Sequence, residues 1–453
     1  SNGSATQYWN STAATSSQFT VGSHVAVNGN GSTYVAYIFA HDDARFGTDE
    51  DESIIKCGTW TASGGAGSIN LGFEPQLVLT KNASGAGAWF IFDNMRGMAV
   101  GGNDAYLRPD TSDDENSGSN FIELTSTGFD VNLGSSQDFI YMAIRRPNKP
   151  PEISTDVFAI DTGNSSSTIP AFDSGFPVDF ALLKEYNTGS NDNFTFNRLT
   201  GSRVMRTNTS AAEVNGGGLW IGDSNVGWSK QYNNTNISYM FKRAPGFFDV
   251  VAYTGTGSAT TINHNLGVAP SVVLIKGRNT TYSWYWQHYA LGANTWMQLN
   301  NQEAGAGNGN IFNNTLPTSS VFSVGSLAGT NGSGNTYIAY LFGDLPGVSK
   351  AGTYTGTGSN INVDCGFTNG ARFVLIKRTD VEITGTTGTN WYVWDSVRGI
   401  VSGNDPYLLL NSSATQVTNT DYVDPLTSGF TVTASAPAAL NVSGGTYLFL
   451  AIA

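Results

Sequence analysis

Histidine and cysteine are considered first, because these side chains bind metals and take part in nucleophilic catalysis. The chain has four histidines and two cysteines, at His24, His41, His264, His288, Cys57 and Cys365. None of them forms the His-x-x-x-His or Cys-x-x-Cys spacing that brings two metal ligands together. The cysteines are too far apart to indicate a disulfide framework, and we expect them to be small buried hydrophobic residues. We therefore expect no catalytic residue, no metal site and no cofactor.

Carboxylates are considered next, because two of them a short distance apart are sufficient to cleave a glycan. Acidic residues cluster at Asp49–Glu52 and Asp113–Glu115. Both clusters lie in polar, turn-rich stretches, and neither recurs elsewhere in the chain. We expect solvated loops here. A calcium site built from loop oxygens is the first alternative, although the EF-hand spacing is absent, and catalysis is the last.

Aromatic side chains that could stack on sugar rings are densest at Trp284–Tyr289. In a strand, the even-numbered residues of this stretch point to one face of the sheet and the odd-numbered residues to the other. At least one face has to be core, and aromatic residues also serve as cross-strand partners. We therefore expect core packing here, with a sugar-binding platform as the alternative.

The segments that carry these residues recur about every hundred residues. An apolar run ends in lysine four times, at Gln76–Lys81, Asp179–Lys184, Ser271–Lys276 and Arg372–Lys377. The four lysines are 103, 92 and 101 residues apart. An aromatic run follows each time, at Trp89–Phe92, Phe194–Phe196, Trp284–Trp286 and Trp391–Trp394. Because the markers keep one order and nearly one spacing, we infer tandem repeats.

A third marker closes each repeat and occurs five times, at Tyr34–Phe39, Phe139–Ile144, Asn236–Phe241, Tyr337–Phe342 and Tyr447–Ile452. The lysine run occurs only four times, so residues 1–41 are predicted to be the C-terminal part of an incomplete first repeat. Its front half was cut away, belongs to a larger chain, or is supplied as a strand by a neighbouring subunit. Complete repeats are predicted at 54–147, 153–246, 248–344 and 350–453, and the one at 153–246 is divergent.

The composition of the repeats predicts strands and turns. Short runs of Val, Ile, Phe, Tyr and Thr alternate with Gly, Asn, Ser and Asp. The runs before each lysine are apolar on both faces, as in a strand that lies between two layers. Proline in the linkers Pro147–Pro151, Ala244–Pro245 and Leu345–Pro346 stiffens the joints. We therefore predict an all-β fold of tandem, jelly-roll-like β-sandwich domains of about 100 residues in a rod-like array.

The charge balance and the length of the apolar runs argue against nucleic acid and membrane, respectively, as partners. With 22 basic and 35 acidic residues, the formal net charge is −13, so the chain repels the phosphates of nucleic acids. No apolar run approaches the roughly 20 residues that a membrane span requires. We expect neither nucleic-acid binding nor a membrane span.

Several sequence strings resemble repeat domains of unknown function in virion proteins of marine, cyanophage-like tailed phages. They are Tyr34–His41, Glu52–Gly58, Asn70–Gln76, Phe92–Gly97, Gly102–Tyr106 and Gly403–Tyr407. The resemblance implies a non-enzymatic structural protein of a tail fibre or other appendage. It also implies a homo-oligomer, often a trimer in such fibres, that contacts other virion proteins and adheres to host-surface glycans. The expected location is the virion exterior, outside the cell.

The repeats differ at the Asp-x-x-Arg-Gly segment, which is present at Asp93–Gly97 and Asp395–Gly399 only. We expect the Asp–Arg pair to brace a turn; a ligand site retained in two repeats is the alternative. Three other functions stay open for the whole chain. They are a glycan depolymerase of a tailspike, a capsid-decorating protein, and an adhesin or filament subunit of a bacterial surface.

Overall fold

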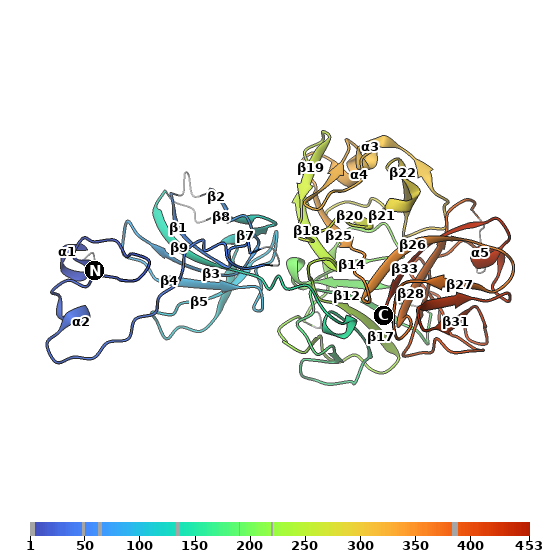
Figure 1. Ribbon diagram of the computed structural model, residues 1–453, viewed down its shortest axis with the longest axis horizontal. Coiled ribbons are helices and arrows are strands. Elements are labelled where there is room, and N and C mark those ends of the chain that lie inside the picture. The colour runs from blue at the N-terminus through green and yellow to red at the C-terminus, as the bar shows by residue number, and fades with distance from the viewer. Residues whose placement is uncertain are drawn as a thin grey trace.

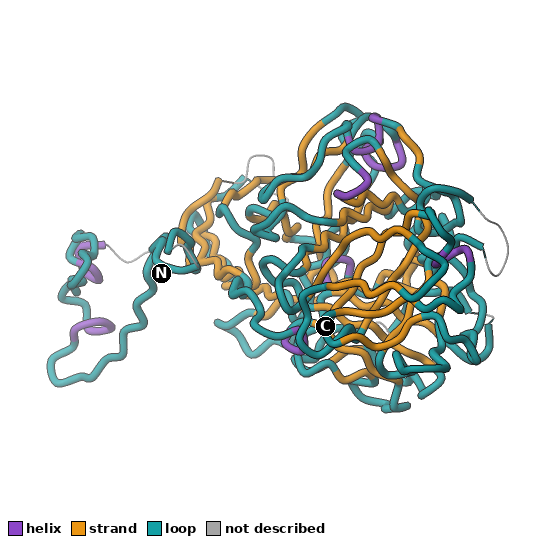
Figure 2. Tube along the Cα trace, turned by 45° about the vertical axis from the view of Figure 1, so that its right-hand side comes forward, coloured by secondary structure: helices purple, strands orange, loops and turns teal. Residues whose placement is uncertain are grey.

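The computed structural model describes residues 5–47, 50–61, 66–132, 136–189, 191–218, 221–382 and 388–453. Within these residues the sheets are all antiparallel, loops and turns join their strands, and the few helices are single turns (Figures 1 and 2). The predicted all-β class with several β-sandwich units is confirmed. None of the described helices is long and apolar enough to cross a membrane.

Each complete repeat has a large sheet and a small sheet that packs on one of its faces. We number the repeats 1 to 4, for residues 54–147, 153–246, 248–344 and 350–453. In every large sheet the closing strand lies between the opening strand and the strand that carries the marker lysine. The closing strand is therefore a central strand that needs two partners.

Repeat 1 has the sheet orders β1-β9-β3-β4-β5-β6 and β2-β8-β7. Its strands are β1 (Ile55–Thr61), β2 (Ala66–Asn70), β3 (Pro75–Asn82), β4 (Trp89–Asp93), β5 (Asp104–Leu107), β6 (Asn116–Ser119), β7 (Ile122–Thr125), β8 (Gly128–Asn132) and β9 (Asp138–Arg145).

Repeat 2 has the orders β10-β17-β12-β13-β14-β15 and β11-β16. Its elements are η1 (Ser154–Asp156), β10 (Phe158–Thr162), β11 (Phe172–Asp173), β12 (Phe180–Glu185), β13 (Phe194–Asn197), η2 (Arg198–Thr200), β14 (Arg203–Arg206), β15 (Val214–Asn215), β16 (Gly227–Trp228) and β17 (Asn236–Phe241).

Repeat 3 has the orders β18-β25-β20-β21-β22-β23 and β19-β24. Its elements are β18 (Phe248–Thr254), β19 (Thr260–Asn263), β20 (Val272–Gly277), β21 (Tyr285–His288), η3 (Tyr289–Leu291), β22 (Thr295–Gln298), β23 (Ala306–Gly307), α3 (Gly309–Phe312), β24 (Val321–Val324), α4 (Ala328–Asn331) and β25 (Thr336–Phe342).

Repeat 4 has the orders β26-β33-β28-β29-β30 and β27-β32-β31. Its elements are β26 (Ser349–Thr355), β27 (Ile361–Asp364), β28 (Phe373–Arg378), β29 (Tyr392–Asp395), β30 (Leu408–Leu409), β31 (Val423–Leu426), β32 (Gly429–Val432), α5 (Ala438–Asn441) and β33 (Thr446–Ile452).

The lysine strands are buried on both faces in repeats 2 to 4, as their composition predicted. In β28, Val374 and Ile376 pack toward the small sheet of repeat 4. Phe373 and Leu375 point the other way, into a core that contains residues of repeats 2 and 3 as well. We call these two sides of a large sheet the inner face and the outer face.

The arrangement of the repeats differs from the predicted row. Repeats 2, 3 and 4 pack around one shared core formed by their outer faces, and repeat 1 lies to the side of this cluster (Figure 1). The linker prolines do not extend the chain, because Pro245 and Pro346 are each followed by a glycine with positive φ, Gly246 (φ 77°) and Gly347 (φ 74°). A Pro–Gly pair of this kind forms a tight turn. The chain therefore folds back at these two joints, and the apolar outer faces of repeats 2, 3 and 4 are buried.

The segment at 5–47 contains two short helices, α1 (Ala5–Trp9) and α2 (Val25–Asn28). Its closing marker at 34–39 forms no strand, and Tyr37 and Ile38 are 84% and 76% exposed. In the complete repeats this strand pairs with an opening strand and a lysine strand, and no strand is found among residues 5–45. Within the described residues the marker segment therefore has no sheet to join.

Candidate functional site

The described residues of the two acidic clusters include several that pair with arginines of repeat 1. Glu52 is paired with Arg145 at 2.8 Å, and Asp49 lies outside the described residues. Asp113 is 3.2 Å from the Arg108 guanidinium, and Glu115 is 3.8 Å from that of Arg96. Across the part of the chain that the structure describes, no three His, Cys, Asp or Glu side chains are grouped so as to hold a metal ion.

The two cysteines and the two buried histidines have structural surroundings. Cys365 is buried and Cys57 partly so, and burial raises the pKa of both thiols, that of Cys365 to about 12. His288 is fully buried; burial lowers its pKa to about 4, and its Nδ1 accepts the N–H of Ala290. His264 Nε2 lies 3.1 Å from the carbonyl oxygen of Thr318. These groups cap turns and fill the core.

The aromatic stretch Trp284–Tyr289 is core, as expected. Trp284 and Trp286 point from the outer face into the core shared by the repeats, and Tyr285 packs on the inner face. Only Tyr289 is substantially exposed, at 41%. A sugar-binding platform on this strand is therefore excluded.

The Asp-x-x-Arg-Gly segments brace turns, as expected. Asp395 accepts the backbone N–H groups of Val397 and Arg398 at 3.1 and 2.9 Å, and it pairs with the Arg398 guanidinium. Asp93 makes the same contacts with Met95 and Arg96.

The two Asp–Arg pairs differ in their surroundings. Asp395 is completely buried and also accepts the hydroxyl of Tyr239, which comes from repeat 2, at 2.8 Å. The side chains of Asp93 and Arg96 are 18% and 28% exposed.

The three buried marker lysines join the repeats in a cycle. Lys184 of repeat 2 donates to the Ser412 carbonyl of repeat 4 at 2.9 Å. Lys276 of repeat 3 donates to the Ser210 carbonyl of repeat 2 at 3.2 Å, and Lys377 of repeat 4 to the Gln302 carbonyl of repeat 3 at 3.1 Å. Each large sheet thus contacts the next one in the same way, with pseudo-threefold symmetry.

Burial lowers the pKa of Lys184 and Lys276 to about 8, and that of Lys377 to about 7. Their acceptors are backbone carbonyls and, for Lys184, also the side-chain oxygen of Asn193, and none of these carries a full charge to offset the loss of hydration. These lysines release their protons close to neutral pH. The sequence marks them by position, but not by this role.

A second set of hydrogen bonds joins the same three repeats in the same cyclic order. The donor is a tryptophan in repeats 3 and 4 and an asparagine in repeat 2. The Trp284 indole N–H donates to the Arg206 carbonyl at 2.8 Å, and the Trp391 indole N–H to the Gln298 carbonyl at 2.9 Å. In repeat 2 the amide of Asn193 takes this place and donates to the Leu409 carbonyl at 3.0 Å. Aromatic residues that looked suitable for sugar binding therefore hold repeats together.

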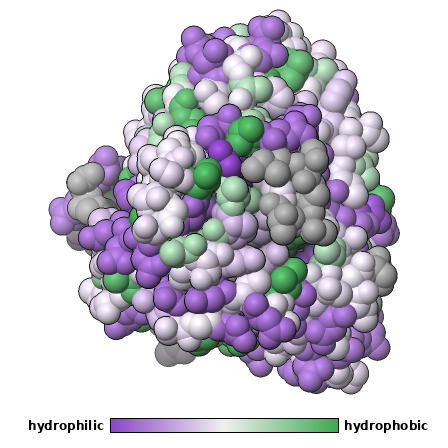
Figure 3. Space-filling view, turned by 90° about the vertical axis from the view of Figure 1, so that its right-hand side faces the viewer, coloured by the Kyte–Doolittle hydropathy of each residue, from purple (hydrophilic) through white to green (hydrophobic). Residues whose placement is uncertain are grey.

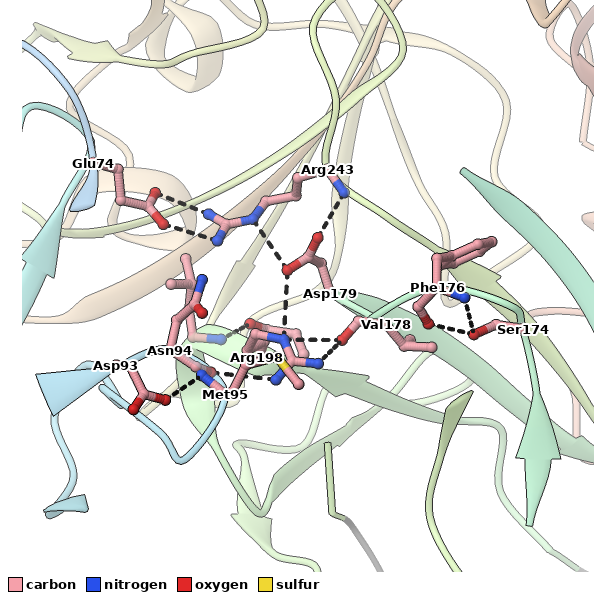
Figure 4. Close-up of polar contacts among 12 residues, drawn as sticks. Glu74, Asp93, Asn94, Met95, Ser174, Phe176, Val178, Asp179, Arg198 and Arg243 are labelled. Atoms are coloured by element: carbon pink, nitrogen blue, oxygen red, sulfur yellow. Dashed lines mark hydrogen bonds and ion pairs between the residues drawn. The ribbon is translucent and has the colours of Figure 1, made fainter. Parts of the chain in front are cut away.

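Repeat 1 is joined to the cluster by buried ion pairs instead (Figure 4). Arg243 pairs with Glu74 of repeat 1 at 2.8 Å and lies 3.6 Å from Asp179. Arg198 lies 3.5 Å from the same aspartate and donates to the Asn94 carbonyl of repeat 1 at 3.2 Å. Burial opposes the charge of Arg243, but the nearby carboxylates outweigh it and raise its pKa. Removing one partner of such a network leaves a buried charge unpaired, which is strongly destabilising.

A groove of about 550 Å³, lined by polar and apolar groups in similar measure, lies at the junction of repeats 1 and 2. Among its lining residues are Arg96, Asn103 and Asn120 of repeat 1 and Arg203 and Asn215 of repeat 2. On the side of the cluster away from repeat 1, polar residues dominate and apolar ones are scattered (Figure 3).

Comparison with known protein families gives one result. The family described as "Domain of unknown function (DUF7483)" matches residues 1–147 and 242–453. The unmatched residues between them contain most of the divergent repeat 2. No curated protein matches the chain. Because the match covers most of its length, the chain belongs to the DUF7483 family.

Proposed function

We propose that the chain is a non-enzymatic structural protein of a phage virion, located on the exterior in a tail fibre or other appendage. The observation that carries this proposal is the cycle of contacts among repeats 2, 3 and 4. The marker lysines and the tryptophans that sequence analysis singled out bind neighbouring repeats there. Side chains that could have served in catalysis or ligand binding thus hold the repeats together. The resemblance to appendage proteins of marine tailed phages supports the location.

The location is tested by gold-labelled antibody against the chain on intact particles. Label at the tail region is the expected result. Label on the head shell overturns the appendage and favours a capsid-decorating protein. Recovery of the chain from the surface of uninfected cells favours a bacterial adhesin or filament subunit.

The absence of an enzymatic role is tested separately. Purified chain is incubated with host envelope polysaccharide, and product length is measured by size-exclusion chromatography beside a glycosidase of known activity. We expect no shortening. Release of oligosaccharides overturns this part of the proposal and favours a tailspike depolymerase.

The adhesive part of the proposal is supported by the groove between repeats 1 and 2. Amide and guanidinium groups donate hydrogen bonds to sugar hydroxyls, and both kinds line this groove. We expect Asn103→Ala and Arg203→Ala to weaken retention of the chain on immobilised host polysaccharide several-fold. Ser359→Ala, at an exposed position of repeat 4, is the control. Equal retention of all three variants contradicts a role for the groove.

A further inference from the structure

The outer face of repeat 1 carries the same kind of residues as the outer faces that form the shared core. It consists of seven apolar residues on strands β3, β4 and β9: Leu77, Leu79, Trp89, Ile91, Ile140, Met142 and Ile144. The strand register is equivalent in repeat 4, where Leu79 and Met142 correspond to Leu375 and Leu450.

The two outer faces differ in burial. In repeat 4, the counterparts of the seven residues are at most 2% exposed: Phe373, Leu375, Trp391, Val393, Leu448, Leu450 and Ile452. In repeat 1, Ile140 is 38% exposed and the other six are half-buried. The same apolar face is thus covered in one repeat and open in the other.

The polar residues at the edge of this face also correspond to residues that contact a neighbouring repeat in the cluster. Lys81 corresponds to the three buried lysines, but it donates to the Gly87 carbonyl of its own loop. Asp110 accepts the backbone N–H of Trp89 at 3.0 Å, as Asn411 does for Trp391. The loop after β5 therefore has the same attachment as the loop that offers carbonyls to a neighbour in the cluster.

We propose that the outer face of repeat 1 binds the same face in two other copies of this chain. Three copies of repeat 1 then reproduce, about a true threefold axis, the arrangement that repeats 2, 3 and 4 form within one chain. This inference rests on the proposed structural role and names the partner in its assembly.

Three observations favour second copies of the chain in a trimer. The face matches, residue by residue and in register, faces whose observed partners are repeats of the same kind. Each of those faces meets two neighbours, so a dimer leaves part of it open. Repeat 1 also projects beside the cluster instead of being enclosed by it (Figures 1 and 2).

The first test is the mass of the purified chain by sedimentation velocity and light scattering. We expect three times the chain mass of 48.0 kDa. Ile140→Glu places a charge on the open face and is expected to give a monomer with an unchanged circular dichroism spectrum, because Ile140 is already partly exposed. Val226→Glu, at a 45% exposed position of repeat 2, is the matched control and should stay trimeric.

The second test locates the contact. A photo-reactive amino acid at Lys81 should crosslink to the stretch 110–112 of another copy, because the counterpart lysines reach Ser412, Ser210 and Gln302, just beyond Asn411, Asn208 and Asn300. A mixture of ¹⁴N- and ¹⁵N-labelled chains identifies links between copies.

A monomeric wild-type chain, a trimer that resists Ile140→Glu, or crosslinks confined to one copy overturn the inference. Any of these results leaves the virion location open, because the antibody experiment tests that separately. A monomer would point instead to further repeats outside residues 1–453 as the partner.

Discussion

Repeats 1 and 4 present nearly the same sheet face to different surroundings. Leu375 and Leu450 lie in a core built by three repeats, whereas Leu79 and Met142 occupy the same register on an open face. Lys377 reaches into the next repeat, whereas Lys81 bends to its own loop. The comparison shows that the alternation of residues along the strands determines that the outer face is apolar. Whether that face becomes part of a core depends on which repeats pack against it.

The divergent repeat 2 adds a second lesson. Asn193 replaces the tryptophan of repeats 3 and 4, yet its amide donates to the corresponding carbonyl of the next repeat, that of Leu409. The divergent repeat thus keeps a side-chain N–H donor to the next repeat, although it has lost the indole ring.

Truncation of the central leucine should separate the two faces most strongly. Leu375→Ala is expected to destabilise the cluster by about 2–5 kcal/mol, because it leaves a cavity in a closed core. Leu79→Ala should cost less than about 1 kcal/mol, because its side chain is half-exposed. Both are measured by urea unfolding in chains that also carry Ile140→Glu, so that repeat 1 stays uncovered. Equal losses would contradict the difference in burial.

The marker lysines should give the next largest contrast, seen as a pH dependence. The unfolded chain holds these protons up to the ordinary pKa near 10.5, whereas the folded chain releases that of Lys377 near 7. The folded state binds fewer protons in this interval, so Lys377 makes stability rise with pH from about 7 to 10, by up to a few kcal/mol. Lys377→Met should flatten the rise in melting temperature between pH 7 and 9.5.

The corresponding change in repeat 1 is the control for this measurement. Lys81→Met, again in the Ile140→Glu background, should leave the pH profile as it is. Parallel profiles for the wild-type chain and Lys377→Met would show that the buried lysine is not the source of the slope.

A smaller effect is expected from the indole contacts. Trp391→Phe removes the donor to the Gln298 carbonyl and leaves that partly buried group without this partner, at a cost of about 1 kcal/mol. Trp89→Phe should change stability by less than about 0.5 kcal/mol in a monomeric background. Calorimetry on both variants checks this, and a larger loss at Trp89 would mean that its indole already has a buried partner.

The smallest contrast is expected at Asp104 and Asp405, because their contacts stay within one repeat. Each accepts two backbone N–H groups, from residues 121–122 and 422–423. Burial raises their pKa to about 6 and about 7, so the folded state binds more protons and stability falls as pH rises from about 4 to 7. Asp104→Asn and Asp405→Asn should each remove a few kcal/mol of this fall, since one pKa unit corresponds to about 1.4 kcal/mol. Clearly different effects at the two sites would contradict their equivalence.

The sequence predicts the strands well and the assembly of the repeats poorly. The all-β class and the lysine strand between two layers follow from composition, because a strand apolar on both faces needs two covers. The packing of repeats 2, 3 and 4 around one core does not follow from composition. Leu79 and Leu375 occupy equivalent positions in similar apolar runs, and nothing in those runs distinguishes an open face from a covered one. Proline in the joints predicts stiff linkers that hold the repeats in line, whereas the glycines after Pro245 and Pro346 turn the chain back.

The roles of single residues were predictable to different degrees. The turn-bracing Asp–Arg pairs follow from their spacing, and the core role of Trp284–Trp286 follows from alternation. The ion pair of Arg243 with Glu74 and the hydrogen bond from Arg198 to the Asn94 carbonyl were not predicted, because both partners are distant in sequence and belong to repeat 1. The recurrence of lysine at the end of each apolar strand was the one signal that could have revealed the cyclic contacts.

Electron cryo-microscopy of the purified chain tests the central claim most directly. The account predicts particles with threefold symmetry, in which three copies of repeat 1 meet at the centre through β3, β4 and β9 and the three clusters lie outside. Particles made of a single chain, or assemblies in which the outer face of repeat 1 stays exposed, would contradict it.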